Sequence, residues 1–81
     1  LHARAATLAQ RLASLTARER EVLGLVLEGR LNKQIAAALG TAEKTVKFHR
    51  GNLMRKMGVR SVAELARWMA EAHAPGGAKA P

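Results

Sequence analysis

Apolar residues recur at helical spacing in five successive stretches of the chain. In the first stretch they are separated by four, three, four and three residues: Leu1, Ala5, Leu8, Leu12 and Leu15. This a/d heptad pattern lies in alanine-rich sequence and predicts a linker helix over residues 1–14. Both a short coiled coil between two subunits and an amphipathic helix packed on its own domain fit the pattern. Two heptads are fewer than the roughly three or four that indicate a coiled coil, which favours the packed helix.

The second stretch predicts a core helix with a well-specified start. Thr16 precedes it and Glu19 stands three residues later, the spacing of a capping box. Val22 and Val26 form an apolar stripe with Leu15, and Gly29 follows as a helix end. Glu19 falls near this stripe. It could therefore meet a basic residue of another helix, with Lys56 a candidate, or it could serve the capping box alone.

Residues 32–57 hold two helical patterns joined by a tight break at Gly40. The first pattern is short, with its apolar residues at Ile35, Ala36 and Leu39. The second is longer, and its apolar stripe consists of Val46, Leu53 and Met57. Asn32 can cap the short helix, and Thr41 or Ala42 can cap the long one.

A last helix follows Gly58, with Ser61 as its cap. Its core stripe consists of Val62, Leu65, Ala66 and Met69. Trp68 lies off that stripe and forms a second apolar strip with Leu65 and Ala72, which could contact a second subunit or the linker helix. Because tryptophan is enriched at the centres of interfaces, we predict a dimer interface of Val62, Leu65, Trp68, Met69 and Ala72. Residues 74–81 have nothing to anchor them and are predicted to be disordered.

The face of the long helix opposite its core stripe is basic and carries an aromatic residue. Helical projection turns Lys44, Phe48, Gly51 and Arg55 outward and leaves Lys47 on the flank. An exposed phenylalanine among cations is unusual for a solvated face. Facing a nucleic acid, the cations would meet phosphates or guanine edges, and Phe48 could contact a thymine methyl.

Composition favours the same partner. The 81 residues include 14 Lys and Arg against 6 Asp and Glu, a net charge of +8, and between positions 30 and 60 the only acid is Glu43. A chain this short leaves little room for an enzyme cleft, and we find no catalytic constellation, cofactor motif or metal-ligand spacing around His49. It has no cysteine, signal segment or membrane-spanning run, so the cytoplasm is the expected location. It starts without methionine, which suggests a piece of a longer protein.

Three segments resemble the LuxR-type helix-turn-helix domain: LTAREREVLGLVLEG, NKQIAAALG and TVKFHRGNLMRKMGV. The resemblance covers residues 15 to about 70, and HRGNLMRKM is most similar to FixJ and NarL response regulators. It implies an all-α protein, with a four-helix effector domain over residues 15–73 after the linker helix. It also implies that residues 42–57 enter the major groove and that residues 61–71 pair two subunits on a two-fold-related site.

The resemblance further implies which residues touch DNA. Base contacts are expected from Lys47, Phe48 and Gly51, and Arg50 or Arg55 could compensate where Gly51 replaces the lysine of relatives. Phosphate contacts are implied for Lys33, Thr45 and Lys56, and the outward face of the long helix adds Lys44 and Arg55 as further candidates. The usual cap serines are replaced by Leu31 and Ala42.

By the same resemblance, the full protein would carry a receiver domain phosphorylated by a sensor kinase, and that domain is absent from this chain. RNA polymerase is a possible further partner. A ligand-responsive regulator carries the same effector and remains an alternative. A different class, a helical protein-interaction or membrane-surface module, would use the heptad helix and Trp68.

Overall fold

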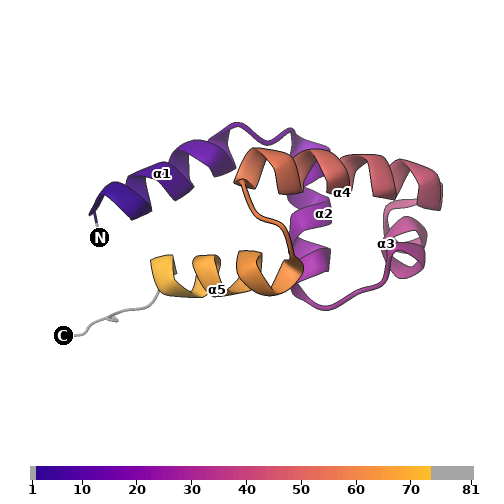
Figure 1. Ribbon diagram of the computed structural model, residues 1–81. Helices are drawn as coiled ribbons and strands as arrows, with labels where there is room; N and C mark the ends of the chain where they lie inside the picture. Colours follow the sequence, from indigo (N-terminus) through magenta and orange to yellow (C-terminus); the bar gives the residue numbers. More distant parts are fainter. Residues whose placement is uncertain (1, 74–81) are drawn as a thin grey trace.

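The computed structural model describes the backbone of residues 2–73 and the side chains of residues 7–71. The described part contains five helices and no strand (Figure 1): α1 His2–Ala13, α2 Ala17–Leu27, α3 Asn32–Leu39, α4 Glu43–Met57 and α5 Val62–His73. The predicted all-α class, with one helix ahead of four others, is confirmed. The predicted disordered tail, residues 74–81, lies outside the described residues.

Local hydrogen bonds fix several helix ends where the sequence predicted them. At the start of α2, Thr16 Oγ1 accepts from the Glu19 N–H at 3.1 Å, and the Glu19 carboxylate accepts from the Thr16 N–H at 2.9 Å. The predicted capping box is therefore present. Ser61 Oγ accepts from the Glu64 N–H at 3.0 Å and caps α5. Gly58 closes α4 in the left-handed conformation, at φ +71°.

The predicted cap of α3 is wrong. Its N-cap is Leu31, and Asn32 is already the first helical residue. The Leu31 N–H is satisfied by the side chain of Gln34 at 2.8 Å. Asn32 Oδ1 instead accepts from Arg50 at 2.8 Å, a donor that sequence spacing does not reveal. For α4, Ala42 takes the N-cap position without a side-chain hydrogen bond, so Thr41 is not the cap.

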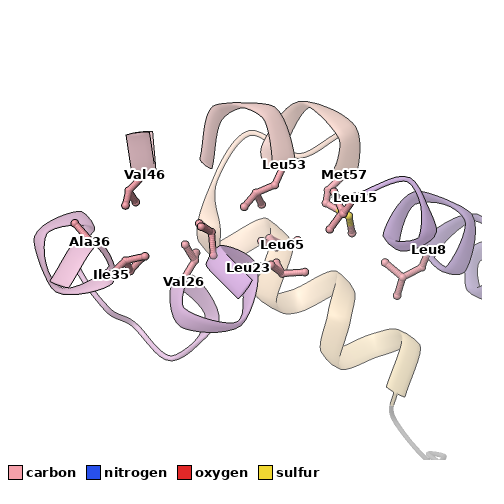
Figure 2. Close-up of a cluster of buried hydrophobic side chains, with 11 residues drawn as sticks. Leu8, Leu15, Leu23, Val26, Ile35, Ala36, Val46, Leu53, Met57 and Leu65 are labelled. Carbon is pink, nitrogen blue, oxygen red and sulfur yellow. The ribbon is translucent and has the colours of Figure 1, made fainter. Parts of the chain in front are cut away.

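The core draws side chains from all five helices (Figure 2). Its fully buried members lie at the predicted stripe positions: Val22, Val26, Ile35, Val46, Leu53, Met57 and Leu65. Helix α4 lies across α2 and packs against α1, α2 and α3, so its apolar stripe is covered along its whole length (Figure 1). This packing fixes the rotation of α4 about its axis and therefore decides which side chains it turns outward.

Helix α1 packs on the core of its own chain. Leu8 is buried, Leu12 is half-buried, and Leu15, just past the helix end, is buried too. The helix contacts α4 and α5, as the amphipathic-helix interpretation of the heptad pattern expects. Within residues 2–73, none of the helices is both long enough and apolar enough to cross a membrane.

Candidate nucleic-acid interface

The outward face of α4 combines an exposed aromatic ring with exposed cations. Phe48 is 66% exposed, while Val46, two residues away, is 0% exposed. Lys44, Lys47, Gly51 and Arg55 are exposed as well, and Thr45 is half-buried. Leaving a phenylalanine in water forgoes about 1.5–3 kcal/mol of burial free energy. A partner that covers the ring would recover it.

The Phe48 ring has one aromatic neighbour within the described chain, His49. The two rings meet edge to face, with centroids 5.7 Å apart and planes inclined by 62°. His49 is half-buried on the flank of the helix. Among the described residues, no group of His, Asp or Glu could hold a metal ion. The exposed face therefore offers cations, an aromatic edge and backbone, which suit a polyanion with apolar base edges.

Arg50 lies toward α3 and is half-buried. Its Nη1 donates to Asn32 Oδ1 at 2.8 Å, which joins the middle of α4 to the first residue of α3. The contact brings the start of α3, including the exposed Lys33, beside the basic face of α4. This hydrogen bond links the two helices, and the base contact expected of Arg50 stays a prediction.

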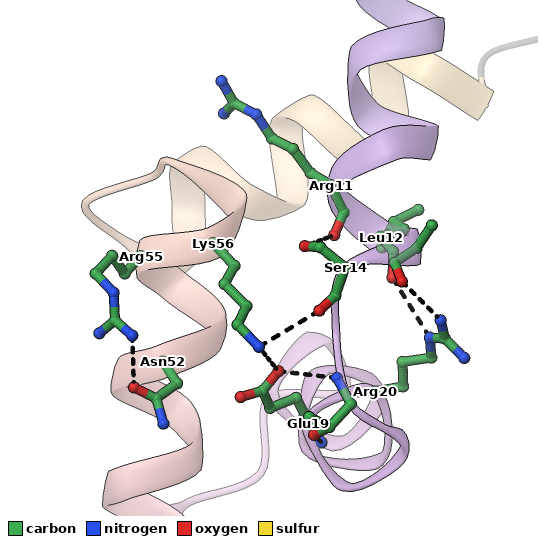
Figure 3. Close-up of polar contacts among 10 residues, drawn as sticks. Arg11, Leu12, Ser14, Glu19, Arg20, Asn52, Arg55 and Lys56 are labelled. Atoms are coloured by element: carbon green, nitrogen blue, oxygen red, sulfur yellow. Dashed lines mark hydrogen bonds and ion pairs between the residues drawn. The ribbon is translucent and has the colours of Figure 1, made fainter.

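Arg55 stays on its own helix. Its Nη2 donates to Asn52 Oδ1 at 2.9 Å, and the side chain remains exposed (Figure 3). This bond uses part of the guanidinium and leaves further N–H donors for a phosphate.

Lys56 contacts Glu19, so the carboxylate fills both of the roles that the sequence left open for it. Its Nζ lies 2.8 Å from Glu19 Oε1, and Glu19 is 3% exposed (Figure 3). The hydrogen bond from Lys56, followed by that from the Thr16 backbone, lowers the pKa of Glu19 below its ordinary value despite burial. Lys56 Nζ also approaches the Ser14 carbonyl at 3.4 Å. Lys56 therefore supports the packing of α4 on α2, and its contact with a DNA phosphate stays a prediction.

The predicted dimer residues lie in different surroundings. Leu65 is 0% exposed, so it belongs to the monomer core, and its assignment to the dimer surface is corrected. Val62, Trp68 and Met69 are half-buried, and the Ala72 side chain lies outside the described part of the chain. The Arg11 guanidinium lies over the Trp68 ring, 5.1 Å from its centroid. Trp68 thus meets the linker helix, the other arrangement that its position allowed.

Sequence reasoning missed Arg11 altogether. Besides covering Trp68, its Nη1 donates to the Met57 carbonyl at 2.7 Å, across 46 residues of sequence. No local sequence pattern predicts such a contact, because it depends on how α1 packs against the C-terminal end of α4 and against α5.

Comparison with known proteins places this geometry in a family. The family described as "Bacterial regulatory proteins, luxR family" matches residues 13–69. The chain is 57% identical over 49 residues to the C4-dicarboxylate transport transcriptional regulatory protein DctR of Rhodobacter capsulatus, covering 60% of this chain and 25% of that protein. It is 50% identical over 64 residues to the response regulator protein TodT of Pseudomonas putida, covering 79% and 28%.

Among solved structures, full-length FixJ from B. japonicum is similar with a TM-score of 0.79 and 38% identity, covering 86% of this chain and 34% of FixJ. The chain thus spans about a quarter to a third of these relatives. Helix-turn-helix domains of this kind bind DNA and regulate transcription, and they are not enzymes. The chain belongs to the LuxR family of bacterial regulatory proteins, and its relatives are response regulators of the FixJ and NarL class.

Proposed function

We propose that this chain is the sequence-specific DNA-binding effector of a two-component response regulator, with α4 inserted in the major groove. The observation that carries the proposal is Phe48, 66% exposed among cations on a helix whose opposite side is fully buried. Helix α4 has 15 residues, so it extends about 22 Å, long enough to follow the groove past several base pairs.

In this proposal the outward face of α4 reads base edges. Lys47 donates to guanine, and Phe48 contacts a thymine methyl. At Gly51 an added Cβ would meet no protein atom within 4 Å, so packing within the protein does not require glycine there. The bare backbone at this position supports a close approach of the helix to the base edges.

Phosphate contacts come from the rim of this face: Lys33, Lys44, Thr45 and Arg55. Lys33 and Lys44 lie in the first turns of α3 and α4, where the helix dipoles also favour an anion. Two copies of the chain bind half-sites about one helical turn apart, pairing through the surface of α5 that α1 leaves open. Val62, Trp68 and Met69 retain exposed surface for this contact.

A further domain of the full protein would control when this effector binds DNA. The relatives named response regulators support a receiver domain, on which a sensor kinase would act. The bacterial nucleoid as the site of action and RNA polymerase as a further partner belong to the same proposal. A ligand-binding domain in place of the receiver is the second candidate, because the same effector serves both.

The test begins with selection of a preferred duplex from a random library. Kd is then measured for the selected duplex and for a scrambled one of equal length at fixed salt. We expect the selected duplex to bind at least about 10³-fold more tightly. Equal affinity for both duplexes would contradict sequence-specific binding. Tighter binding to acidic lipid vesicles than to any duplex at physiological salt would instead support the membrane-surface module.

A further inference from the structure

Arg11 joins the linker helix to both helices that end or begin near Gly58. Its guanidinium donates to the Met57 carbonyl at 2.7 Å and lies 5.1 Å above the centre of the Trp68 ring. The first contact caps the C-terminal end of α4 with a cation, where the helix dipole favours positive charge. The second is a cation–π contact with α5. One side chain therefore ties α1, α4 and α5 together.

Gly58 leaves the space that this guanidinium occupies. A Cβ built on Gly58 would overlap Arg11 Nη1, whereas a Cβ on Gly40, the corresponding end of α3, would meet nothing within 4 Å. Both glycines have positive φ, +71° and +67°. The left-handed turn accounts for glycine at both positions, and at Gly58 the Arg11 guanidinium also lies in the space that a side chain would occupy.

Cations from other helices also contact the C-terminal end of α1. The last carbonyls of the α1 segment accept from cations of α2 and α4 (Figure 3). Arg20 donates to the Leu12 and Ala13 carbonyls, each at 3.4 Å, and Lys56 donates to the Ser14 carbonyl at 3.4 Å. The C-terminal ends of α1 and α4 thus each receive a cation from the other helix. Two hydrogen bonds therefore join the C-terminal parts of α1 and α4: one from Arg11 to the Met57 carbonyl and one from Lys56 to the Ser14 carbonyl.

The position of α1 leaves the proposed DNA face open. It contacts the C-terminal end of α4, whereas Lys47 and Phe48 lie in the first half of that helix and are exposed. A docked α1 is therefore compatible with a duplex on the outward face. It also contacts the C-terminal end of α4 through the Met57 carbonyl.

We propose that Arg11 is a positioning residue for DNA binding: it clamps α1 to the end of the recognition helix and to Trp68 and so makes α1 part of the DNA-binding unit. This inference rests on the proposed function. It extends the unit beyond residues 15–73, and it gives an upstream domain a direct mechanical connection to α4.

The experiment compares Arg11→Ala, Arg11→Lys and the control Arg18→Ala in the full chain. Arg18→Ala removes the same charge, and within the described side chains, residues 7–71, Arg18 pairs with Glu21 on the surface of α2. Trp68 is the only tryptophan and the chain has no tyrosine, so its emission reports on the Arg11 contact directly. Kd for the selected and scrambled duplexes is measured on the same samples, with far-UV circular dichroism to confirm folding.

For Arg11→Ala we expect Trp68 emission at longer wavelength and binding to the selected duplex about 3- to 30-fold weaker than for Arg18→Ala. Arg11→Lys should restore part of both signals, because an ammonium can still approach the carbonyl and the ring. If Arg11→Ala does not fold, Arg11→Lys against wild type gives the same comparison.

Unchanged emission in Arg11→Ala would overturn the clamp. Shifted emission with affinity equal to that of Arg18→Ala would overturn the positioning role. A wild-type chain that does not distinguish the two duplexes would overturn the proposed function together with the role of Arg11 in it, an outcome visible before any variant is compared.

Discussion

At the scale of single residues, the most constrained charge is the Glu19 carboxylate. It is buried, yet it accepts hydrogen bonds from the Thr16 N–H and from Lys56. These donors favour the ionised form more than burial opposes it, so the pKa of Glu19 lies below its ordinary value. The ionised carboxylate holds the C-terminal half of α4 against the start of α2.

We expect Glu19 to contribute to acid unfolding. Because its folded pKa is lowered, its stabilisation is fully present above the unfolded value of about 4.3 and is lost as the pH falls through the folded pKa. Replacing it by Gln should reduce the free energy of unfolding near neutral pH by about 2 kcal/mol and flatten its decline in acid. Urea denaturation at a series of pH values measures both effects.

The matched control is Glu21→Gln, which breaks an exposed pair with Arg18 and should change stability by less than about 0.5 kcal/mol. Parallel acid profiles for wild type and Glu19→Gln would contradict the prediction.

Residue features that depend on a single helix could be predicted from the sequence, whereas contacts between two helices could not. The exposure of Phe48 and the burial of Glu19 were predictable, because helical projection alone turns Phe48 outward and Glu19 toward the core. The pairing of Glu19 with Lys56 was one of two roles that the sequence left open. The Arg50–Asn32 contact was not predictable, since it depends on the spacing between α3 and α4. The same contact explains the wrong cap: Asn32 has a better partner than its own helix.

At the scale of elements, α4 carries a glycine in its interior that the fold does not require. A Cβ at Gly51 meets no atom within 4 Å, and the same holds for Gly24 in the interior of α2. Glycine in a helix is less favourable than alanine by up to about 1 kcal/mol. Gly51 and Gly24 therefore differ only in the surface that they face.

We expect Gly51→Ala and Gly24→Ala each to raise the free energy of unfolding by about 0.5–1 kcal/mol, measured by chemical denaturation. Only Gly51→Ala should weaken binding to the selected duplex, because only there does α4 approach base edges. Equal effects of the two substitutions on Kd would argue against a close approach at position 51.

The helix ends offer a second matched pair, Gly58 and Gly40. Alanine in the left-handed conformation costs about 1–2 kcal/mol at either position. Gly58→Ala should lose roughly 1–2 kcal/mol more than Gly40→Ala, since it also displaces Arg11 from the Met57 carbonyl. Thermal unfolding of both variants tests this difference, and similar losses would show that the Arg11 contact adds little stability.

At the scale of the whole molecule, the net charge of +8 makes DNA binding dependent on salt. We expect Lys33→Ala to weaken selected and scrambled duplexes by the same factor, because a phosphate contact carries no sequence information. The slope of log K against log salt should become shallower by about 0.9, the loss of one phosphate contact. A change in the ratio of the two affinities would place Lys33 on a base instead.

The fold was largely predictable because its cues are local. Heptad spacing, the capping box at Thr16 and the glycine at position 58 define helix order and most of the ends. The heptad pattern favoured a helix α1 packed on its own domain, but the contacts of Arg11 with α4 and α5 could not be predicted, since they depend on tertiary structure. Whether Leu65 belongs to the core or to a dimer surface could not be decided from the sequence, because it lies on both apolar strips of α5. The packed structure shows that it is fully buried in the core.

The central claim is that the outward face of α4 reads bases, and the most direct measurement is the specificity ratio of variants on that face. Kd for the selected and scrambled duplexes is measured at one salt concentration for Lys47→Ala, Phe48→Ala and the control Arg18→Ala. We predict that the first two lose about 1–3 kcal/mol on the selected duplex and much less on the scrambled one. Equal losses on both duplexes, with the ratio of wild type retained, would contradict the claim.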